Sequence, residues 1–384
     1  MSQPLVVLGS GLAGISVLRE LRKIDALRPI TLVTWEDGGF YSKPSLSNAF
    51  AQGKSAAQLL ITPREALAVQ LKAEIRAGIR VTAIAPERHE ISVDGEVVPY
   101  AQLVLAVGAQ PIRLPIAGDG AAEILSVNGL NDYICLRQQL QHKRRVAILG
   151  AGLIGCEFAN DLAAVGFAVR VFDIAPQPLG RLLPTATAEF FRQRLEAVGV
   201  RFHFGSSIAR ADKNGDSYQL TDSAGERYEA DLVLSAVGLK PEISLAQAAS
   251  LAINRGIVVD RQLATSATDV YAVGDCAEVG GLNLPFVMPI MQQARALAKT
   301  LSGTPTEVVY PAMPVVVKTP ACPTVVCPPP AGAVGQWHEE SIADGMRARF
   351  ENSEGLTLGF ALTGDAVAEK QALSATLPAW LPGP

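Results

Sequence analysis

The 384-residue chain is long enough for two or three domains that each bury a core of their own. Its 33 Lys and Arg nearly balance 37 Asp and Glu, and the net charge of −4 excludes a general attraction to nucleic acid or to an anionic membrane. No apolar run approaches the roughly 18 residues that a membrane helix needs, and the N-terminus has no signal-peptide pattern, so we expect a cytoplasmic protein without membrane insertion.

Two segments of the chain repeat one order of elements: a buried strand, a glycine turn, a helix and a second strand. We predict these elements at residues 4–8, 9–14, 15–24 and 30–34 in the first unit, and at 145–149, 150–155, from there through 165, and 168–172 in the second. The offset of 141 residues between Gly9 and Gly150 indicates a duplicated domain rather than a solenoid of short repeats.

The segments between and after the two units indicate how the units are connected. Residues 89–98 alternate in polarity on either side of an Asp-Gly turn and predict a hairpin. Apolar strands at 103–107 and 232–237 each end in a glycine, and we expect both exits to be crossings between domains. A buried strand at 270–273 is placed back in the first domain, so the second unit is nested inside the first.

The composition of the chain changes at Tyr310, after which prolines recur between short runs of residues that favour β-strands. This tail predicts a small, separate α+β domain that covers one side of the others. The expected fold class is therefore α/β, with two Rossmann-like domains built from βαβ units on parallel sheets and a small C-terminal domain. We place the first domain at 1–110 and 240–309, the nested second domain at 111–239 and the C-terminal interface domain at 310–384.

Both glycine turns carry the Gly-x-Gly-x-x-Gly pattern in the context that a dinucleotide site requires. Each turn follows a buried strand and opens a helix, so that the backbone can approach a pyrophosphate and the helix N-terminus faces its negative charge. Each copy also has an acid roughly 20 residues further on, Glu36 or Asp173, that could hydrogen-bond an adenosine ribose. The alternative, two tight turns with surface acids, is disfavoured because both copies are complete.

Asp173 also bears on the choice of nicotinamide nucleotide. Its carboxylate would repel a 2′-phosphate, and the next basic residue is Arg181. The second site should therefore prefer NADH to NADPH unless Arg181 folds back toward it.

Several further segments resemble one known family, the FAD-dependent pyridine-nucleotide reductases of the glutathione-reductase structural class. Within this family the chain is most similar to the rubredoxin reductases and their flavorubredoxin-reductase relatives. The resemblance covers nearly the whole chain. Besides the first glycine turn, it rests on residues 41–47 (YSKPSLS), 105–111 (LAVGAQP), 150–157 (GAGLIGCE), 236–241 (AVGLKP) and 271–275 (YAVGD).

The resemblance implies that the first unit holds FAD and the second holds NADH. The implied FAD residues are Gly9, Ser10, Gly11, Leu12, Ala13, Gly14, Thr34, Trp35, Glu36, Lys43, Pro44, Val81, Ala106, Val107, Gly108, Gly274, Asp275, Val287 and Lys318. The implied NAD residues are Gly150, Gly152, Leu153, Ile154, Gly155, Glu157, Asp173, Val237 and Gly238. Asp275 is expected to take the ribityl hydroxyl of the flavin, and Lys318 to reach the pyrimidine end of its ring from the tail.

Lys43 and Glu157 are the implied catalytic residues. A lysine near the reactive nitrogen of the flavin would stabilise the reduced ring, and a nearby glutamate would hold that lysine charged and aimed. The alternatives are a solvated loop lysine and a helix-surface acid. Many ferredoxin-linked relatives carry Arg in place of Lys43 and Lys in place of Asn48, and relatives often have Thr in place of Val107, so this chain lacks one hydrogen bond there.

The cysteines and histidines narrow the choice of electron acceptor. Disulfide reductases of this class need two cysteines beside the flavin, but residues 38–50 contain none, and Ser42 stands where a flavin-linked peroxidase or oxidase would have a redox cysteine. We interpret Cys322 and Cys327 as packed thiols, because their odd spacing points them to opposite faces of an extended strand. No histidine lies in a His-Pro-Thr-type tail motif. Electrons should therefore leave the flavin directly, one at a time.

These features together lead us to expect an NADH:rubredoxin reductase that feeds a hydroxylase, such as an alkane monooxygenase, or an oxygen-detoxifying system. Rubredoxin is a small, acidic one-electron carrier, so we expect it to dock on basic residues near the flavin, with Lys43, Lys54, Arg64 and Lys318 as candidates. Three alternatives stay open: a ferredoxin or flavorubredoxin reductase, an NADH oxidase, and a flavin-bearing interaction protein that senses NADH.

Overall fold

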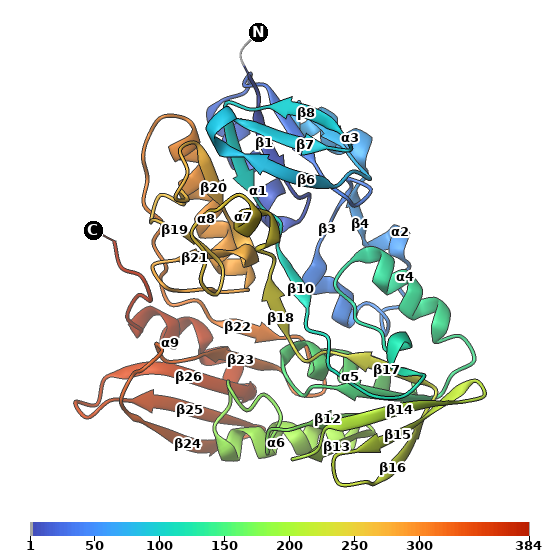
Figure 1. Cartoon of the computed structure of the whole chain (residues 1–384). Helices are drawn as coiled ribbons and strands as arrows, with labels where there is room; N and C mark the ends of the chain where they lie inside the picture. Colours follow the sequence, from blue (N-terminus) through green and yellow to red (C-terminus); the bar gives the residue numbers. More distant parts are fainter. Residues whose placement is uncertain (1–2, 384) are drawn as a thin grey trace.

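The first domain is built on a five-stranded parallel sheet with the order β20-β9-β1-β2-β5, in a computed structural model that describes residues 3–383 (Figure 1). Its strands are β1 (Leu5–Leu8), β2 (Ile30–Val33), β5 (Glu74–Arg76), β9 (Gln102–Leu105) and β20 (Val270–Ala272). The helices α1 (Leu12–Ile24) and α8 (Val287–Leu301) pack against each other. The carboxyl ends of these strands share one edge, where the first glycine turn lies.

The remaining elements of this domain lie around that sheet. The predicted hairpin at residues 89–98 is confirmed as β7 and β8, which form an antiparallel sheet with β6. The bounds are β3 (Phe40–Tyr41), α2 (Ala56–Leu59), β4 (Leu60–Thr62), α3 (Arg64–Leu71), β6 (Val81–Ala85), β7 (Glu90–Val93), β8 (Glu96–Pro99), α7 (Ser244–Ala248), β19 (Ile257–Val259) and β21 (Ala277–Val279). A 3-10 helix spans Lys43–Asn48.

The second domain repeats the parallel arrangement with the order β13-β12-β11-β17. An antiparallel sheet of β14, β15 and β16 packs on it through an apolar cluster that includes Leu149 and Leu220. The bounds are α4 (Leu130–Gln139), β11 (Arg145–Leu149), α5 (Leu153–Ala163), β12 (Ala168–Asp173), α6 (Thr185–Ala197), β13 (Val200–Phe204), β14 (Ile208–Asn214), β15 (Ser217–Asp222), β16 (Arg227–Ala230) and β17 (Leu232–Ser235).

Two short strands connect the domains. β10 (Ala109–Pro111) and β18 (Leu239–Pro241) pair in antiparallel register, and each directly follows a glycine that lies three residues beyond the end of a core strand. These glycines, Gly108 and Gly238, have positive φ of 73° and 112°, a conformation that a side chain would strain. After this pair the chain returns to the first sheet, because β20 lies beside β9. The predicted crossings and the nesting of the second unit are confirmed.

The tail folds into a five-stranded sheet with the order β22-β23-β26-β25-β24, next to the second domain in Figure 1. One face of this sheet packs on the second domain, since Val326, Ala348 and Ala361 belong to the same buried cluster as Phe158 and Phe191. The bounds are β22 (Val315–Val317), β23 (Thr324–Cys327), β24 (Gln336–Ile342), β25 (Gly345–Glu351), β26 (Thr357–Gly364) and α9 (Lys370–Thr376). The predicted α+β tail, and with it the predicted fold class, is confirmed.

Within residues 3–383, no helix has both the length and the apolar character needed to cross a bilayer.

Candidate active site

The three glycines of the first turn have different surroundings: the middle one faces open space, and the two outer ones pack too closely against the backbone to allow a side chain. A Cβ on Gly9 would collide with the carbonyl oxygen of Ala106, and a Cβ on Gly14 would collide with the carbonyl oxygen of Gly9. A Cβ on Gly11 would meet no atom within 4 Å. The outer glycines are therefore required for strand–turn–helix packing, whereas the middle glycine faces open space that a pyrophosphate could occupy.

The second turn repeats this division at corresponding positions. A Cβ would collide with the carbonyl oxygen of Ala236 at Gly150 and with the carbonyl oxygen of Gly150 at Gly155, whereas Gly152 again faces open space. In the described part of the chain, no side chain caps the helices that start after Gly11 and Gly152. The free amide groups of their first turns can bind an anion, so both turns fit a dinucleotide.

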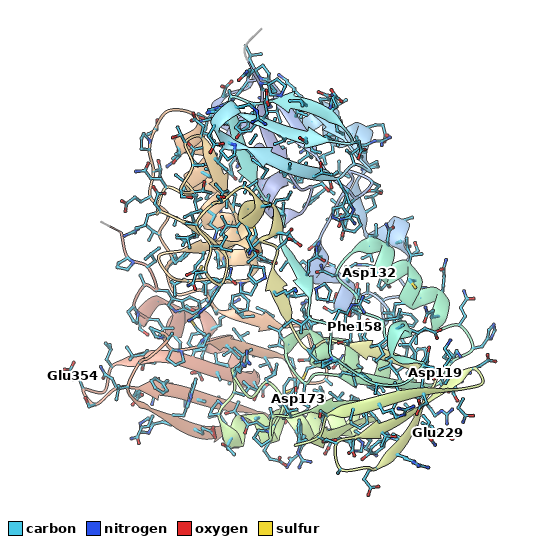
Figure 2. All side chains as sticks on the ribbon, in the orientation of Figure 1. Asp119, Asp132, Phe158, Asp173, Glu229 and Glu354 are labelled. Atoms are coloured by element: carbon cyan, nitrogen blue, oxygen red, sulfur yellow. The ribbon has the colours of Figure 1, made fainter. Side chains whose placement is uncertain are left out.

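The two predicted ribose acids lie beside their turns. At the end of β12, Asp173 (labelled in Figure 2) accepts hydrogen bonds from the amides of Ala151, at 2.5 Å, and Ala175, at 2.7 Å. Glu36 accepts from the Tyr41 hydroxyl at 3.2 Å, and its carboxylate lies 4.0 Å from the Lys43 ammonium. Each carboxylate is held by the protein and partly accessible, as a ribose ligand must be.

Asp275 follows β20, in the second segment of the first domain, where that segment meets the first glycine turn. A Cβ on the preceding residue, Gly274, would contact the side chain of Ala13 in that turn. The Gly274 amide donates to Gln293 at 2.6 Å, which fixes the backbone before Asp275. Burial raises the pKa of Asp275, and the nearby charge of Lys43 opposes that shift.

The other predicted cofactor residues lie on the same segments. The hydroxyls of Ser10 and Thr34 are 3.0 Å apart, and the half-exposed ring of Trp35 stacks under the Arg80 guanidinium. The remaining residues lie at the starts of helices (Leu12, Ala13, Leu153, Ile154 and Val287), after β9 (Ala106, Val107 and Gly108), after β17 (Val237 and Gly238), in β6 (Val81) and in the 3-10 helix (Pro44). Their contacts with a cofactor stay predictions.

Glu157 is the centre of a buried polar cluster to which all three domains contribute. Its side chain is 1% exposed. The Lys318 ammonium lies 2.6 Å from both carboxylate oxygens, and the Lys318 amide donates to one of them at 2.9 Å. The Ser47 hydroxyl donates to the other at 2.5 Å. Glu157 on the second domain thus binds the tail and the first domain at once.

This cluster corrects the predicted pairing of Lys43 with Glu157. The Lys43 ammonium lies near Glu36 instead, and Lys318 is the cation that binds Glu157. The physical reason is the fold of the tail, which brings Lys318 to a carboxylate 161 residues earlier in the chain, a contact that no local pattern encodes.

Two side chains one turn further along α5 were not singled out from the sequence. Asp161 accepts hydrogen bonds from the amides of Phe50 and Ala51 at 2.8 and 3.0 Å. Asn160 accepts from the Ala321 amide at 3.0 Å. The available signal was three polar residues at helical spacing on an otherwise apolar helix, which puts them on one face of α5.

The cysteines do not form a redox centre among the described residues. All five are unpaired, and all except Cys135 are buried. Burial raises the pKa of the Cys276 thiol to about 11 and that of Cys327 to about 12, so neither is a thiolate near neutral pH. The interpretation of Cys322 and Cys327 as packed thiols agrees with their burial, although Cys322 lies before β23 rather than on it.

Comparison with known proteins places this geometry in a class. Residues 3–299 match the family described as Pyridine nucleotide-disulphide oxidoreductase, and residues 307–377 match the one described as Rubredoxin binding C-terminal domain. The chain belongs to the pyridine nucleotide-disulphide oxidoreductase family. It is an oxidoreductase that uses FAD and a nicotinamide dinucleotide, and the predicted enzyme class and cofactors are confirmed.

Particular relatives are similar over the full chain. The rubredoxin-NAD(+) reductase of Alcanivorax borkumensis is 47% identical over 381 residues, which cover 99% of this chain and 100% of that protein. The nitric oxide reductase FlRd-NAD(+) reductase of Aeromonas salmonicida is 39% identical, covering 98% of this chain and 97% of that protein. The crystal structure of a ferredoxin reductase for the CYP199A2 system from Rhodopseudomonas palustris superposes with a TM-score of 0.88 at 26% identity, covering 98% of this chain and 96% of that one.

Proposed function

We propose that this chain is an NADH:rubredoxin reductase, which takes a hydride from NADH onto FAD and passes the electrons singly to rubredoxin. The observation that carries the proposal is the combination of two dinucleotide-binding units with a tail, residues 307–377, that matches a rubredoxin-binding domain. Full-length similarity to rubredoxin-NAD(+) reductases supports it. The flavin supplies the conversion from a two-electron donor to a one-electron acceptor.

The two glycine turns divide the cofactors between the domains. We assign FAD to residues 1–110 and 240–309, NADH to 111–239, and the docking interface to 310–384. In each dinucleotide domain the free amides at the helix start bind the pyrophosphate, and the acid after the second strand binds the ribose.

Four charged residues act at the flavin cofactor in this proposal. Lys43 and Lys318 provide positive charge that stabilises the reduced ring, and Glu157 holds the Lys318 ammonium in place with two contacts of 2.6 Å. Asp275 binds the ribityl chain. The burial of Glu157 strengthens its interaction with Lys318, because water does not screen it from that side.

The partner of this enzyme is an acidic one-electron carrier, and the basic residues near the site differ in their availability to it. Lys318 forms an ion pair with the buried Glu157 carboxylate, and Arg64 forms an ion pair with Glu65 at 2.9 Å on the surface. Lys54 is exposed, and Lys43 is held only loosely, with its ammonium 4.0 Å from Glu36 and its side chain 38% exposed. We therefore assign the docking charge to Lys43 and Lys54 first, with a contact that weakens as salt is added.

A second candidate is a flavorubredoxin reductase with the same chemistry, favoured by the 39% identity to the Aeromonas salmonicida relative. The two functions, and the NADH oxidase alternative, are separated by steady-state rates of the FAD-loaded protein with NADH and each acceptor. Reduction of rubredoxin faster than reduction of flavorubredoxin, ferredoxin or oxygen supports the proposal. A faster rate with any of the other acceptors contradicts it.

The cytoplasm is the compartment that we assign to this enzyme. Its five cysteines are all unpaired within the described residues, as is usual for proteins of a reducing compartment. The downstream acceptor of its electrons is a hydroxylase or an oxygen-detoxifying system.

A further inference from the structure

The polar face of α5 organises two separate segments around Glu157. One is the Lys43–Asn48 3-10 helix and the residues after it, and the other is the tail segment that begins at Lys318. Each segment bonds to Glu157 first and then bonds to α5 again three or four residues later. Both segments therefore run along the helix in its own direction, in step with its turns.

The first segment is held at its end by Asp161. Ser47 donates to Glu157, and the amides of Phe50 and Ala51 then donate to the two oxygens of Asp161. The Asp161 side chain is 3% exposed and pairs with no cation among the described residues. Burial raises the pKa of Asp161, and the charge of Glu157 raises it further against the effect of the two amide bonds.

Burying the Asp161 carboxylate is unfavourable, but it allows one side chain to bind two backbone amides. A carboxylate has two oxygens that each accept from one amide, whereas an asparagine has one accepting oxygen and would direct its own N–H groups at the second amide. Asp161 can therefore fix two consecutive peptide groups, which sets the course of the segment that carries Ser47 and Lys43.

The second segment is held at its end by Asn160. Lys318 bonds to Glu157 through both its amide and its ammonium, and the Ala321 amide then donates to the Asn160 side chain. Asn160 is 4% exposed, so water cannot easily replace this bond. Each neighbour of Glu157 on this face of α5 thus secures the segment that delivers one partner of Glu157.

We propose that Asn160 and Asp161 are positioning residues for hydride transfer, which place Lys318 and Ser47, respectively, on the carboxylate of Glu157. The inference rests on the proposed function, since it takes Glu157 and Lys318 to act at the flavin. Neither residue is catalytic itself. A merely structural role would lower stability without distinguishing between the two partners of Glu157.

The test is a crossed pair of double-mutant cycles in the full-length, FAD-loaded protein. Asn160→Ala and Asp161→Ala are each combined with Lys318→Met and with Ser47→Ala. Anaerobic mixing with NADH gives the limiting rate of flavin reduction and the apparent dissociation constant for NADH separately. Asn160→Ala and Asp161→Ala alone should each lower the limiting rate by about tenfold with little change in the dissociation constant. A small misplacement of Lys318 or Ser47 lowers the rate of the reaction rather than the affinity for NADH.

The pattern of coupling decides the proposal. Asn160→Ala should add less than about twofold in the Lys318→Met background but multiply fully in the Ser47→Ala background, and Asp161→Ala should do the reverse. Full multiplication in all four combinations would overturn it. Asp161→Asn, which keeps one accepting oxygen, should fall between wild type and Asp161→Ala and serves if the alanine variant does not fold.

Asp231 provides the matched control. Its carboxylate also accepts from two consecutive amides of the second domain, those of Arg144 and Arg145, but at the end of β11 remote from the glycine turn. Asp231→Ala should reduce stability and leave the limiting rate unchanged. A loss of rate like that of Asp161→Ala would show that any weakened domain slows the reaction, and would overturn the proposal.

The same cycles are read in equilibrium unfolding, which needs no turnover. The unfolding constants should couple in the same two pairs and multiply in the crossed ones. If NADH did not reduce the flavin of the wild type, the proposed function would fail, and the unfolding cycles would still show whether Asn160 and Asp161 hold these partners. Coupling absent from both readouts would overturn the inference alone.

Discussion

Replacing Lys318 by methionine tests the buried cluster around Glu157 directly. The substitution keeps a long apolar stem but removes the ammonium that lies 2.6 Å from both oxygens of Glu157. The carboxylate, 1% exposed, is left with the Ser47 hydroxyl and one amide as partners. Breaking a buried ion pair from one side costs about 3–5 kcal/mol. The Lys318 side chain is 27% exposed, so we expect the lower end, about 3 kcal/mol.

The assay is equilibrium urea unfolding of the FAD-saturated protein, with two comparison variants. Arg349→Met removes a cation from the same domain whose side chain is 45% exposed and lies 3.4 Å from Glu351, and it should cost less than about 1 kcal/mol. The double variant Glu157→Gln with Lys318→Met removes both charges, so it should recover part of the loss. The reasoning is refuted if Lys318→Met costs no more than Arg349→Met, or if the double variant is less stable than Lys318→Met.

Three further substitutions test other parts of the account. Asp173→Asn should lower the ratio of kcat/KM for NADH over NADPH by about tenfold, about 1.4 kcal/mol; an unchanged ratio contradicts the assignment. Glu157→Ala should slow single-turnover flavin reduction without loss of FAD, and an unchanged rate counts against it. Burial raises the pKa of Asp231, but hydrogen bonds from Arg145 and backbone amides lower it to about 2 overall. Asp231 therefore contributes about 2 kcal/mol to the free energy of unfolding above pH 4, and this contribution is lost as the pH falls through 2. In denaturation experiments, the difference in stability between wild type and Asp231→Asn should shrink on acidification.

The parts of the fold that local pattern determines were predictable from the sequence. An apolar run followed by Gly-x-Gly-x-x-Gly predicts a strand, a turn and a helix, because the glycines are needed wherever the backbone packs against a neighbouring carbonyl, as at Gly9 and Gly150. The helix predicted at residues 15–24 begins earlier, at Leu12, since the residues after Gly11 are already helical. Boundaries of this kind depend on hydrogen bonds that propensity does not specify.

The candidate site was predictable only in part, because local pattern determines some of its residues and long-range packing determines the others. Glu36 lies beyond β2 and Asp173 ends β12, at corresponding places in the two repeated units, so their positions follow from the local pattern. Asp275 has no counterpart in the second unit, and only the resemblance to the family implied its role. The contact between Lys318 and Glu157 depends on how the tail packs across α5, and neither residue's neighbours reveal it. Nested domains bring segments together that are far apart in sequence, and this is where a reading by local pattern fails.

The central claim is that the two glycine turns bind FAD and NADH and that the electrons pass from the flavin to rubredoxin. An anaerobic titration of the purified protein, followed by flavin absorbance, tests this claim most directly. The account predicts one FAD per chain, bleaching by one equivalent of NADH, and return of the oxidised spectrum on adding two equivalents of oxidised rubredoxin, since each accepts one electron. A protein that takes up no flavin on soaking, a flavin that NADH leaves oxidised, or a reduced flavin that rubredoxin does not reoxidise would contradict it.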